Sequence, residues 1–144
     1  MTAAGLLFAK AAPADPQSAY HRAVMTCELC AAAEVLFETP LAYVRPDSSS
    51  LGKGHVIVVP KRHVESYFDM NAQEQAAVFE LLHKAQKSLQ ALYKPDGYNI
   101  GVNVGVAAGQ ARMHVHVHLI PRYAGDVPDP RGGIRCVLAG KSRA

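Results

Sequence analysis

His114-Val115-His116-Val117-His118-Leu119-Ile120 is the stretch that decides the fold and the chemistry of this 144-residue chain. Successive side chains of a β-strand point to opposite faces. The spacing therefore predicts a strand over 113–120, with three imidazoles on one face and valines in the core. An imidazole titrates near neutrality, binds metals, transfers protons and attacks phosphorus or carbon. Three of them within five residues indicate a chemical site rather than a solvated strand face.

Two chemistries suit this pattern, and the periodicity does not separate them. In the first, the histidines hold a catalytic zinc whose bound water becomes the nucleophile. In the second, the middle imidazole of His116 is itself the nucleophile, and its neighbours fix its tautomer and move protons. Nearby, Asn103 and Gln110 offer neutral donors for phosphate oxygens, and Gly105 and Gly109 allow close backbone approach. A surface lined by glycines and side-chain amides beside imidazoles suits a phosphoryl substrate.

Three apolar runs before the middle of the chain, and one alternating run after it, are typical of strands. They cover residues 35–37, 41–44, 55–59 and 98–106, and Pro60 ends the third run. That third run is rich in β-branched residues, which predicts a strand buried on both faces. Strands before and after one long helix predict an α+β fold with a mostly antiparallel sheet.

The long helix is predicted between two strong end signals. Asn71 caps its start and Glu74 follows three residues later, as in a capping box, while Pro95-Asp96-Gly97 ends it with a turn. This stretch carries an apolar stripe, which predicts the face that packs on the sheet. The stripe consists of Val78, Leu81, Leu82, Ala85, Leu89 and Leu92.

Composition indicates one domain and excludes several classes of protein. Hydrophobic residues make up 49% of the sequence, enough for a buried core, and the net charge is only +3. No run approaches the roughly 18 apolar residues of a membrane span, and so small a charge argues against binding to long nucleic acids. We expect an N-terminal arm over 1–24 with a short helix into Met25, one domain over 25–137, and a tail over 138–144.

The three cysteines predict a reducing compartment, the cytoplasm, because an odd number does not pair within one chain. Cys27 and Cys30 have the Cys-x₂-Cys spacing of a zinc site. A redox pair has the same spacing, but the strand before it and the helix after it that such a pair requires are not evident here. Cys136 is expected to be a free thiol.

The histidine stretch resembles the signature of the histidine triad superfamily. The resemblance implies a homodimer whose subunits each contain a five-stranded antiparallel sheet, one long helix and one short helix. It further implies hydrolysis or transfer of nucleotidyl groups from small substrates, namely dinucleoside polyphosphates or nucleoside phosphoramidates. The match covers roughly Cys27 to Val137, and its motifs are 54–63, Gly97-Tyr98-Asn99, Asn103, Ala108-Gly109-Gln110, 114–120, Pro121-Arg122-Tyr123 and 125–133.

The same resemblance implies a role for each catalytic residue. His116 would attack the α-phosphorus and form a nucleotidyl-histidine intermediate, which water then hydrolyses. His118 would contact the non-bridging phosphate oxygens, and His55 would support the triad from behind. Gln110 matches a position that acts on phosphate or on the leaving group.

The substrate-binding set implied by the resemblance is Asn103, Gly109, Gln110, Asp47 and His118. Asp47 falls eight residues before His55, where the family has the acid that binds ribose. The chain departs from the family pattern at Ala111, where a hydroxyl residue often protonates the leaving group, and at Ser48-Ser49-Ser50, which replaces a more apolar loop.

A structural zinc is also implied by the resemblance. In many triad proteins the ion is held by a Cys-x₂-Cys pair, a later histidine and the first triad histidine, which here are Cys27, Cys30, His63 and His114. Four protein ligands close the tetrahedron, so the ion would be structural, with one per chain.

Two alternative functions stay open from the sequence. A weakened proton path at Ala111 would suit a nucleotide-binding regulatory module with little turnover. A zinc-dependent hydrolase whose metal is held by the triad itself is the other, although Cys27 and Cys30 offer the metal a softer site elsewhere.

Overall fold

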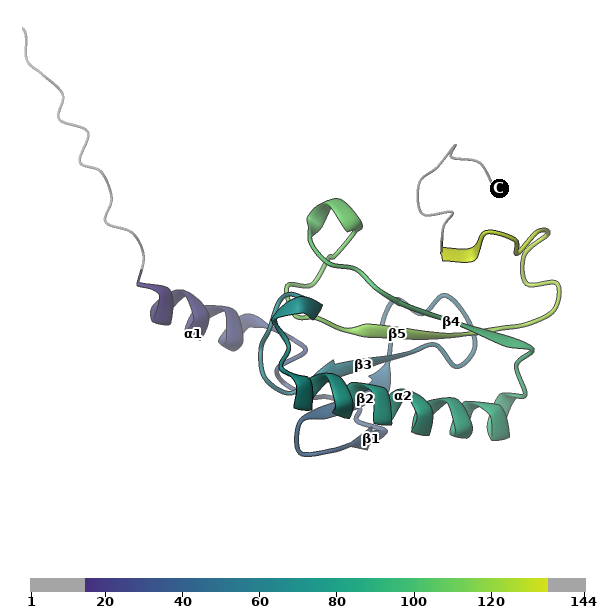
Figure 1. The fold of residues 1–144 in the computed structure, drawn as a ribbon, viewed down its shortest axis with the longest axis horizontal. Helices are drawn as coiled ribbons and strands as arrows, with labels where there is room; N and C mark the ends of the chain where they lie inside the picture. Colours follow the sequence, from purple (N-terminus) through teal and green to yellow (C-terminus); the bar gives the residue numbers. More distant parts are fainter. Residues whose placement is uncertain (1–14, 135–144) are drawn as a thin grey trace, which may run out of the picture.

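The apolar run that follows His55 forms the centre of a five-stranded sheet, and all five residues of this strand are buried. The computed structural model describes residues 15–134. Every strand pairing in this part of the chain is antiparallel, which confirms the predicted fold class. In spatial order the strands are β1 (Phe37–Glu38), β2 (Ala42–Pro46), β3 (Val56–Pro60), β5 (Val117–Arg122) and β4 (Gly97–Val102) (Figure 1).

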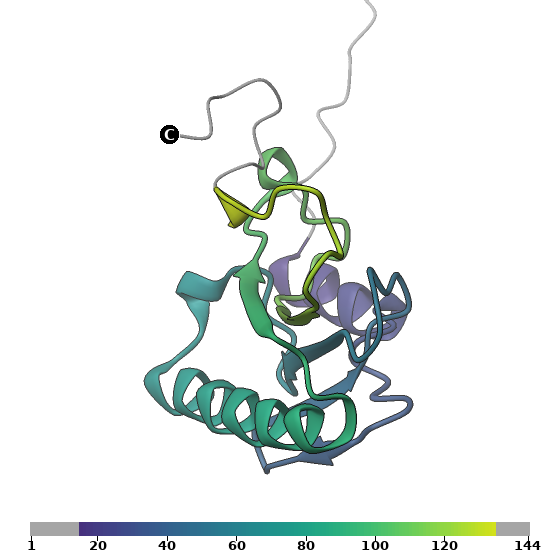
Figure 2. The ribbon, with the colours of Figure 1, turned by 90° about the vertical axis from the view of Figure 1, so that its right-hand side faces the viewer.

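One long and one short α-helix accompany the sheet, as predicted. The long helix runs along one face of the sheet, and the short helix projects beyond one end of it and buries none of its residues (Figures 1 and 2). Two 3₁₀ turns lie in the connections. The helical elements are α1 (Pro16–Thr26), η1 (Tyr67–Asp69), α2 (Ala72–Tyr93) and η2 (Val106–Ala108).

The predicted capping box begins α2. The side chain of Asn71 accepts from the backbone N–H of Glu74, and the Glu74 carboxylate accepts from the backbone N–H of Asn71, both over 2.9 Å. These two bonds satisfy donors that the first turn of a helix leaves free. The apolar stripe packs on the sheet as far as Leu89, but Leu92 is 70% exposed.

The two faces of the sheet carry different side chains. Val56 and Leu119 are partners across β3 and β5 and belong to the core beneath α2. Ile57 and His118 are the next pair in the register, so they point to the opposite face. Ile57 there belongs to a smaller apolar cluster with Leu29 from the N-terminal loop. The histidine chemistry therefore lies on the face away from α2.

The predicted histidine strand is wrong in its extent. Strand β5 begins at Val117, so it contains only His118 of the three histidines. The preceding residues leave the sheet because the N–H of Val115 donates to the carbonyl of Val64 over 2.7 Å, in the loop after β3. Both valines of the motif are buried in the core as predicted.

The strand predicted over 98–106 also ends early. Strand β4 stops at Val102, and Gly105 takes a φ of +83°, a left-handed value that favours glycine and turns the chain into η2. All residues of β4 are half-buried or exposed, so the expected alternation is not seen.

Part of the predicted domain plan lies outside the described residues. These parts are Cys136, the tail over 138–144 and most of the arm before α1. Helix α1 spans the predicted boundary between residues 24 and 25, and the domain limits stay a prediction. Within 15–134, none of the helices has both the length and the apolar character needed to cross a membrane.

Candidate functional site

His116 has a free ring nitrogen next to the sheet. Its Nδ1 atom lies 2.8 Å from the carbonyl oxygen of His114. A carbonyl oxygen only accepts, so Nδ1 carries the proton and Nε2 keeps its lone pair. The residue is 7% exposed, and its ring lies edge-on to that of His118, with centroids 4.9 Å apart. An imidazole in this tautomer is able to act as a nucleophile through Nε2.

His55 and His118 form a chain with a defined direction. The backbone N–H of Leu51 donates to Nδ1 of His55 over 3.1 Å, so the proton of the neutral His55 ring is on Nε2. This Nε2–H lies 3.0 Å from Nδ1 of His118 and donates to it. The proton of His118 is therefore on its own Nε2, available to a phosphate oxygen. Burial lowers the pKa of both rings, which favours these neutral forms at pH 7.

Asp47 lies within the histidine cluster and is 5% exposed. Its Oδ2 atom is 3.4 Å from Nε2 of His55 and 3.3 Å from Nδ1 of His118, and its Oδ1 accepts from the N–H of Ser49 over 3.0 Å. Burial opposes ionisation, but the Ser49 N–H and the neighbouring histidine and Arg112 side chains together lower the pKa of Asp47. An ionised carboxylate thus lies beside the Nε2–H of His55, which points between Asp47 and Nδ1 of His118.

Gln110 connects three backbone segments beside the cluster and is 5% exposed. Its Oε1 accepts from the N–H of Gly105 over 2.7 Å, and its Nε2 donates to the carbonyl oxygens of Glu65 and Arg112 over 2.7 and 3.1 Å. These bonds engage both donors and the oxygen of the amide. A phosphate contact from Gln110, as the family pattern implies, would replace one of them.

Asn103 and Gly109 lie on the exposed loop around η2. Nδ2 of Asn103 donates to the carbonyl of Gly109 over 3.5 Å, and Gly109 has a φ of +84°. A glycine is required here because other residues are strained at this φ. The structure therefore places both predicted phosphate contacts in one turn.

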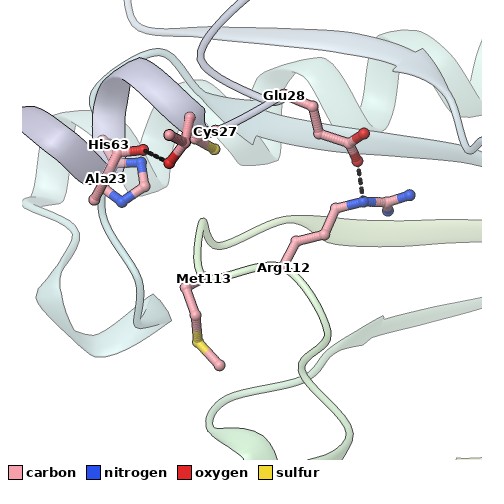
Figure 3. A pocket seen from close by; sticks show the side chains of 7 residues that line it. Ala23, Cys27, Glu28, His63, Arg112 and Met113 are labelled. Atoms are coloured by element: carbon pink, nitrogen blue, oxygen red, sulfur yellow. Dashed lines mark hydrogen bonds and ion pairs between the residues drawn. The ribbon is translucent and has the colours of Figure 1, made fainter.

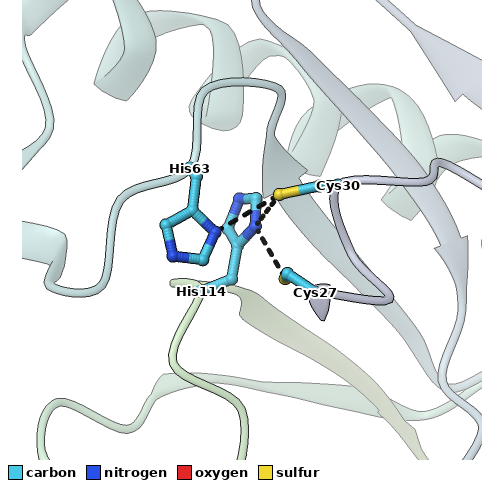
Figure 4. A group of neighbouring side chains, drawn as sticks. All are labelled: Cys27, Cys30, His63 and His114. Carbon is cyan, nitrogen blue, oxygen red and sulfur yellow. Dashed lines mark hydrogen bonds between the residues drawn. The ribbon is translucent and has the colours of Figure 1, made fainter. Parts of the chain in front are cut away.

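A second cluster brings together the four predicted metal ligands (Figure 4). The ligand atoms of Cys27, Cys30, His63 and His114 all lie within 4.8 Å of one another. Both sulfurs are 3.5 Å from Nδ1 of His114, and Cys30 Sγ is 3.2 Å from Nδ1 of His63. A tetrahedral zinc with bonds of about 2.3 Å to sulfur and about 2.0 Å to nitrogen separates such ligands by about 3.5 Å. The donor set and its spacing fit this ion.

The tautomer of His114 suits a metal ligand. Its Nε2 atom lies 2.8 Å from the carbonyl oxygen of Pro60, so Nε2–H donates there and the Nδ1 lone pair points to the sulfurs. Burial lowers the pKa of His114 to about 4, which keeps the ring neutral. Burial, together with Cys27, raises the pKa of Cys30 to about 11, so metal binding would release a proton from this thiol.

The triad is divided between the two clusters. His114 points to the cysteines, whereas His118 contacts Asp47 and His55, and the ring of His116 lies edge-on to that of His118. This division disfavours a catalytic metal held by all three triad histidines. A metal held by Asp47, His55 and His118 is disfavoured as well. The hydrogen bond from the Leu51 N–H to Nδ1 of His55 puts the ring proton on Nε2, and Nε2 is the nitrogen that would have to bind the metal.

Two groups outside the predicted set belong to the site. The N–H of Leu51 sets the tautomer of His55. A backbone role of this kind is not predictable from the type of the residue. Arg112 lies 3.5 Å from the Asp47 carboxylate. The sequence could have indicated Arg112, because it is the charged residue between Gln110 and His114.

Several known proteins are similar to this chain in sequence or in fold. A HIT-like protein of Methanocaldococcus jannaschii is 40% identical over 96 residues, which are 65% of this chain and 72% of that protein. The asymmetrical bis(5'-nucleosyl)-tetraphosphatase of Schizosaccharomyces pombe is 34% identical over 93 residues; the match covers 65% of this chain but only 51% of that enzyme. The crystal structure of a HIT family protein from Bacillus anthracis superposes with a TM-score of 0.65 at 31% identity, over 68% of this chain and 74% of that one.

The family assignment rests on the extent of one further match. The model of the HIT domain matches residues 28–125, well over half of the chain, and this range contains β1 to β5 and all three triad histidines. The resemblance seen in the sequence is thereby confirmed, and the chain belongs to the HIT domain family.

Proposed function

We propose that this chain is a nucleotidyl hydrolase or transferase that cleaves at the α-phosphate of dinucleoside polyphosphates or nucleoside phosphoramidates. The observation that carries the proposal is the Nδ1–H bond from His116 to the carbonyl of His114, which leaves Nε2 as a free nucleophile. The tetraphosphatase among the relatives supports the substrate class.

The reaction proceeds in two displacements at phosphorus. Nε2 of His116 forms a bond to the α-phosphorus as the bond to the leaving oxygen or nitrogen breaks, and a nucleotidyl-histidine results. Water then attacks the same phosphorus, the nitrogen–phosphorus bond breaks, and a nucleoside monophosphate leaves. His118 donates Nε2–H to a non-bridging oxygen, and His55 holds His118 in the tautomer that can do so.

The test compares the wild type with His116→Asn and with His83→Asn, an exposed histidine on α2. His116→Asn should lower the turnover of both substrate classes by about 10³-fold or more, whereas His83→Asn should not change it. Rapid acid-free quenching and mass spectrometry should detect a nucleotidyl adduct on His116. Near-normal turnover in His116→Asn, or an adduct on another residue, would refute the assignment.

A binding module with little turnover is the second candidate. Gln110, whose amide is already engaged, and Ala111, which has no hydroxyl, both favour it. Saturable binding of adenosine monophosphate by a wild-type protein that hydrolyses neither substrate class would support this module. Multiple turnover of either class would exclude it.

We also propose one structural zinc per chain, held by Cys27, Cys30, His63 and His114. The spacing of these ligands and the tautomer of His114 support it, and reduced thiols suit the cytoplasm. Protein purified without chelators should contain about one zinc per chain, and Cys30→Ser should lose it and melt at a lower temperature. Wild-type protein that is purified without chelators, contains no zinc and melts at the same temperature with and without added zinc would contradict this site.

We further propose that two chains form a homodimer through β4. This strand lies at one edge of the sheet, so its outer backbone groups have no strand partner within residues 15–134, and Ile100 on it is 51% exposed. A second copy of the same strand would satisfy these groups.

A further inference from the structure

One peptide unit joins the candidate metal ligands to the nucleophile. The carbonyl of His114 accepts from Nδ1–H of His116 over 2.8 Å. The N–H of the same peptide unit belongs to Val115 and donates to the carbonyl of Val64 over 2.7 Å. A peptide unit is planar, so its N–H bond and the position of His114 together fix the direction of the His114 carbonyl. The tautomer of His116 therefore depends on how firmly His114 and Val64 are held.

Both of these residues are tied to the metal ligands (Figure 4). His114 is itself a ligand, and its ring is fixed by both sulfurs on Nδ1 and by the Pro60 carbonyl on Nε2. Val64 directly follows the ligand His63, whose Nδ1 lies 3.2 Å from Cys30 Sγ. An ion bound by these ligands would thus hold the peptide unit from both sides.

His63 is the ligand whose position depends most on the ion. A histidine that binds a metal through one ring nitrogen usually donates from the other to an oxygen. Nε2 of His114 does so to Pro60, but Nε2 of His63 is buried and has no hydrogen-bond partner within residues 15–134. Loss of the ion would therefore release His63 first, and Val64 with it.

The bond to the His114 carbonyl matters most while His116 reacts. As Nε2 of His116 bonds to the α-phosphorus, the ring gains positive charge and its Nδ1–H stays in place. A hydrogen bond from a charged donor is about twice as strong as one between neutral groups. The His114 carbonyl therefore stabilises the transition state more than the free enzyme, so its displacement should lower kcat rather than raise KM.

We propose that the metal ligands His63 and His114 are positioning residues for the nucleophile, because with the ion bound they hold the peptide unit whose carbonyl fixes the tautomer of His116. The inference rests on the proposed zinc site and on the proposed nucleotidyl transfer. Removal of the ion should therefore impair catalysis in protein that remains folded.

A hollow beside the ligands gives a chelator access to them. It has a volume of about 250 Å³ and opens between the end of α1 and the turn before His114, and Cys27 and His63 line it (Figure 3). The test therefore compares three forms of the wild type. The first contains zinc, the second has been freed of zinc by a chelator, and the third contains Cd²⁺, a larger ion that thiolates also bind.

NMR spectra of the histidine rings give a readout that needs no substrate. With zinc, the nitrogen shifts of His116 should show a proton on Nδ1 and none on Nε2. Without zinc we expect a mixture of both tautomers, and with Cd²⁺ a shifted Nδ1 signal. His83 is the internal control, since its Nδ1 lies 3.0 Å from the carbonyl of Phe79 on α2, outside both clusters, and its signals should not change.

An unchanged tautomer of His116 in folded, zinc-free protein would overturn the proposal. If zinc-free protein unfolds, the Cd²⁺ form decides, because it keeps the four ligands bound; a His116 signal identical to that of the zinc form would then overturn the proposal.

Kinetics separate positioning from general stability. Removal of zinc should lower kcat for diadenosine tetraphosphate and for adenosine 5'-phosphoramidate about tenfold or more, change KM by less than about threefold, and be reversed by added zinc. The control is Val78→Ala, at a position in the core that is 1% exposed, which should lower the melting temperature but not kcat. If Val78→Ala lowered kcat as much as removal of zinc does, the effect would be one of stability alone and the proposal would be wrong.

The two readouts distinguish failure of this inference from failure of the proposed function. A wild type without turnover whose His116 tautomer changes with zinc would refute the nucleotidyl transfer and support the positioning role. Full turnover in zinc-free protein with an unchanged tautomer would refute the positioning role alone. Protein that takes up no zinc would overturn the inference whatever its turnover.

Discussion

Nε2 of His55 lies 3.0 Å from Nδ1 of His118, and a backbone group outside the pair decides which atom donates. The N–H of Leu51 occupies Nδ1 of His55, so the proton lies on Nε2 and the bond runs from His55 to His118. The carboxylate of Asp47 lies within 3.4 Å of both atoms. The orientation of His118 thus depends on the loop that joins β2 to β3.

Substitution of His55 tests the direction of the hydrogen bond from His55 to His118. His55→Gln can keep a donor near the position of Nε2, whereas His55→Ala removes it, so we expect kcat to fall about tenfold or more in the alanine variant and less in the glutamine variant. Steady-state kinetics of the two variants measure the difference. Equal activity of the two variants would show that the donor at this position has no role.

Gln110 should contribute to stability before it contributes to catalysis. Gln110→Leu leaves the Gly105 N–H and the carbonyls of Glu65 and Arg112 without their partner, and we expect a loss of about 2–3 kcal/mol in the free energy of unfolding. Urea titration measures it. If stability were unchanged while turnover was lost, Gln110 would instead act on the substrate, as the family pattern implies.

The pair of Arg62 and Glu74 should make stability depend on pH. Nε and Nη2 of Arg62 donate to the Glu74 carboxylate over 2.7 and 2.8 Å, and this contact lowers the pKa of Glu74 below its ordinary value of 4.5. Ionised Glu74 therefore stabilises the fold above about pH 4.5, and this contribution is lost as the pH falls through the lower folded-state pKa.

Glu74→Gln isolates this effect. At pH 7 the variant should be less stable by about 1–2 kcal/mol, and the difference from the wild type should vanish in the most acidic range where both remain folded. Urea unfolding from pH 7 to pH 3 measures it. Glu38→Gln is the matched control, since its pair with Lys61 is exposed and should contribute almost nothing. A constant difference at every pH would contradict the role of the charge.

Strand β4 should control the oligomeric state. Ile100→Glu places a charge on the exposed edge strand and should convert a dimer to a monomer with no loss of secondary structure. Light scattering after size exclusion gives the mass, and Leu92→Glu, at an exposed position on α2, is the control. A wild type that is monomeric at micromolar concentration would refute the dimer.

Much of the fold was predictable because its signals are local. The capping box of Asn71 and Glu74 and the apolar stripe after it depend on neighbours within a few residues, and α2 forms where they predict. The β-branched run before Pro60 likewise predicted a fully buried strand. The extent of the histidine strand was not predictable, because it depends on a bond from Val115 to Val64, half the domain away in sequence.

The sequence by itself determined which residues are candidates for the chemistry, namely the histidine motif, the Cys-x₂-Cys pair and the glycine turn before the motif. Only the tertiary structure decided how they work. The tautomer of each ring is set by a partner on another segment, such as Pro60 for His114 across 54 residues, and Asp47 meets Arg112 only because β2, β3 and β5 lie side by side. Residue types reveal which atoms can donate or accept, but pairing across the sheet determines which of them meet.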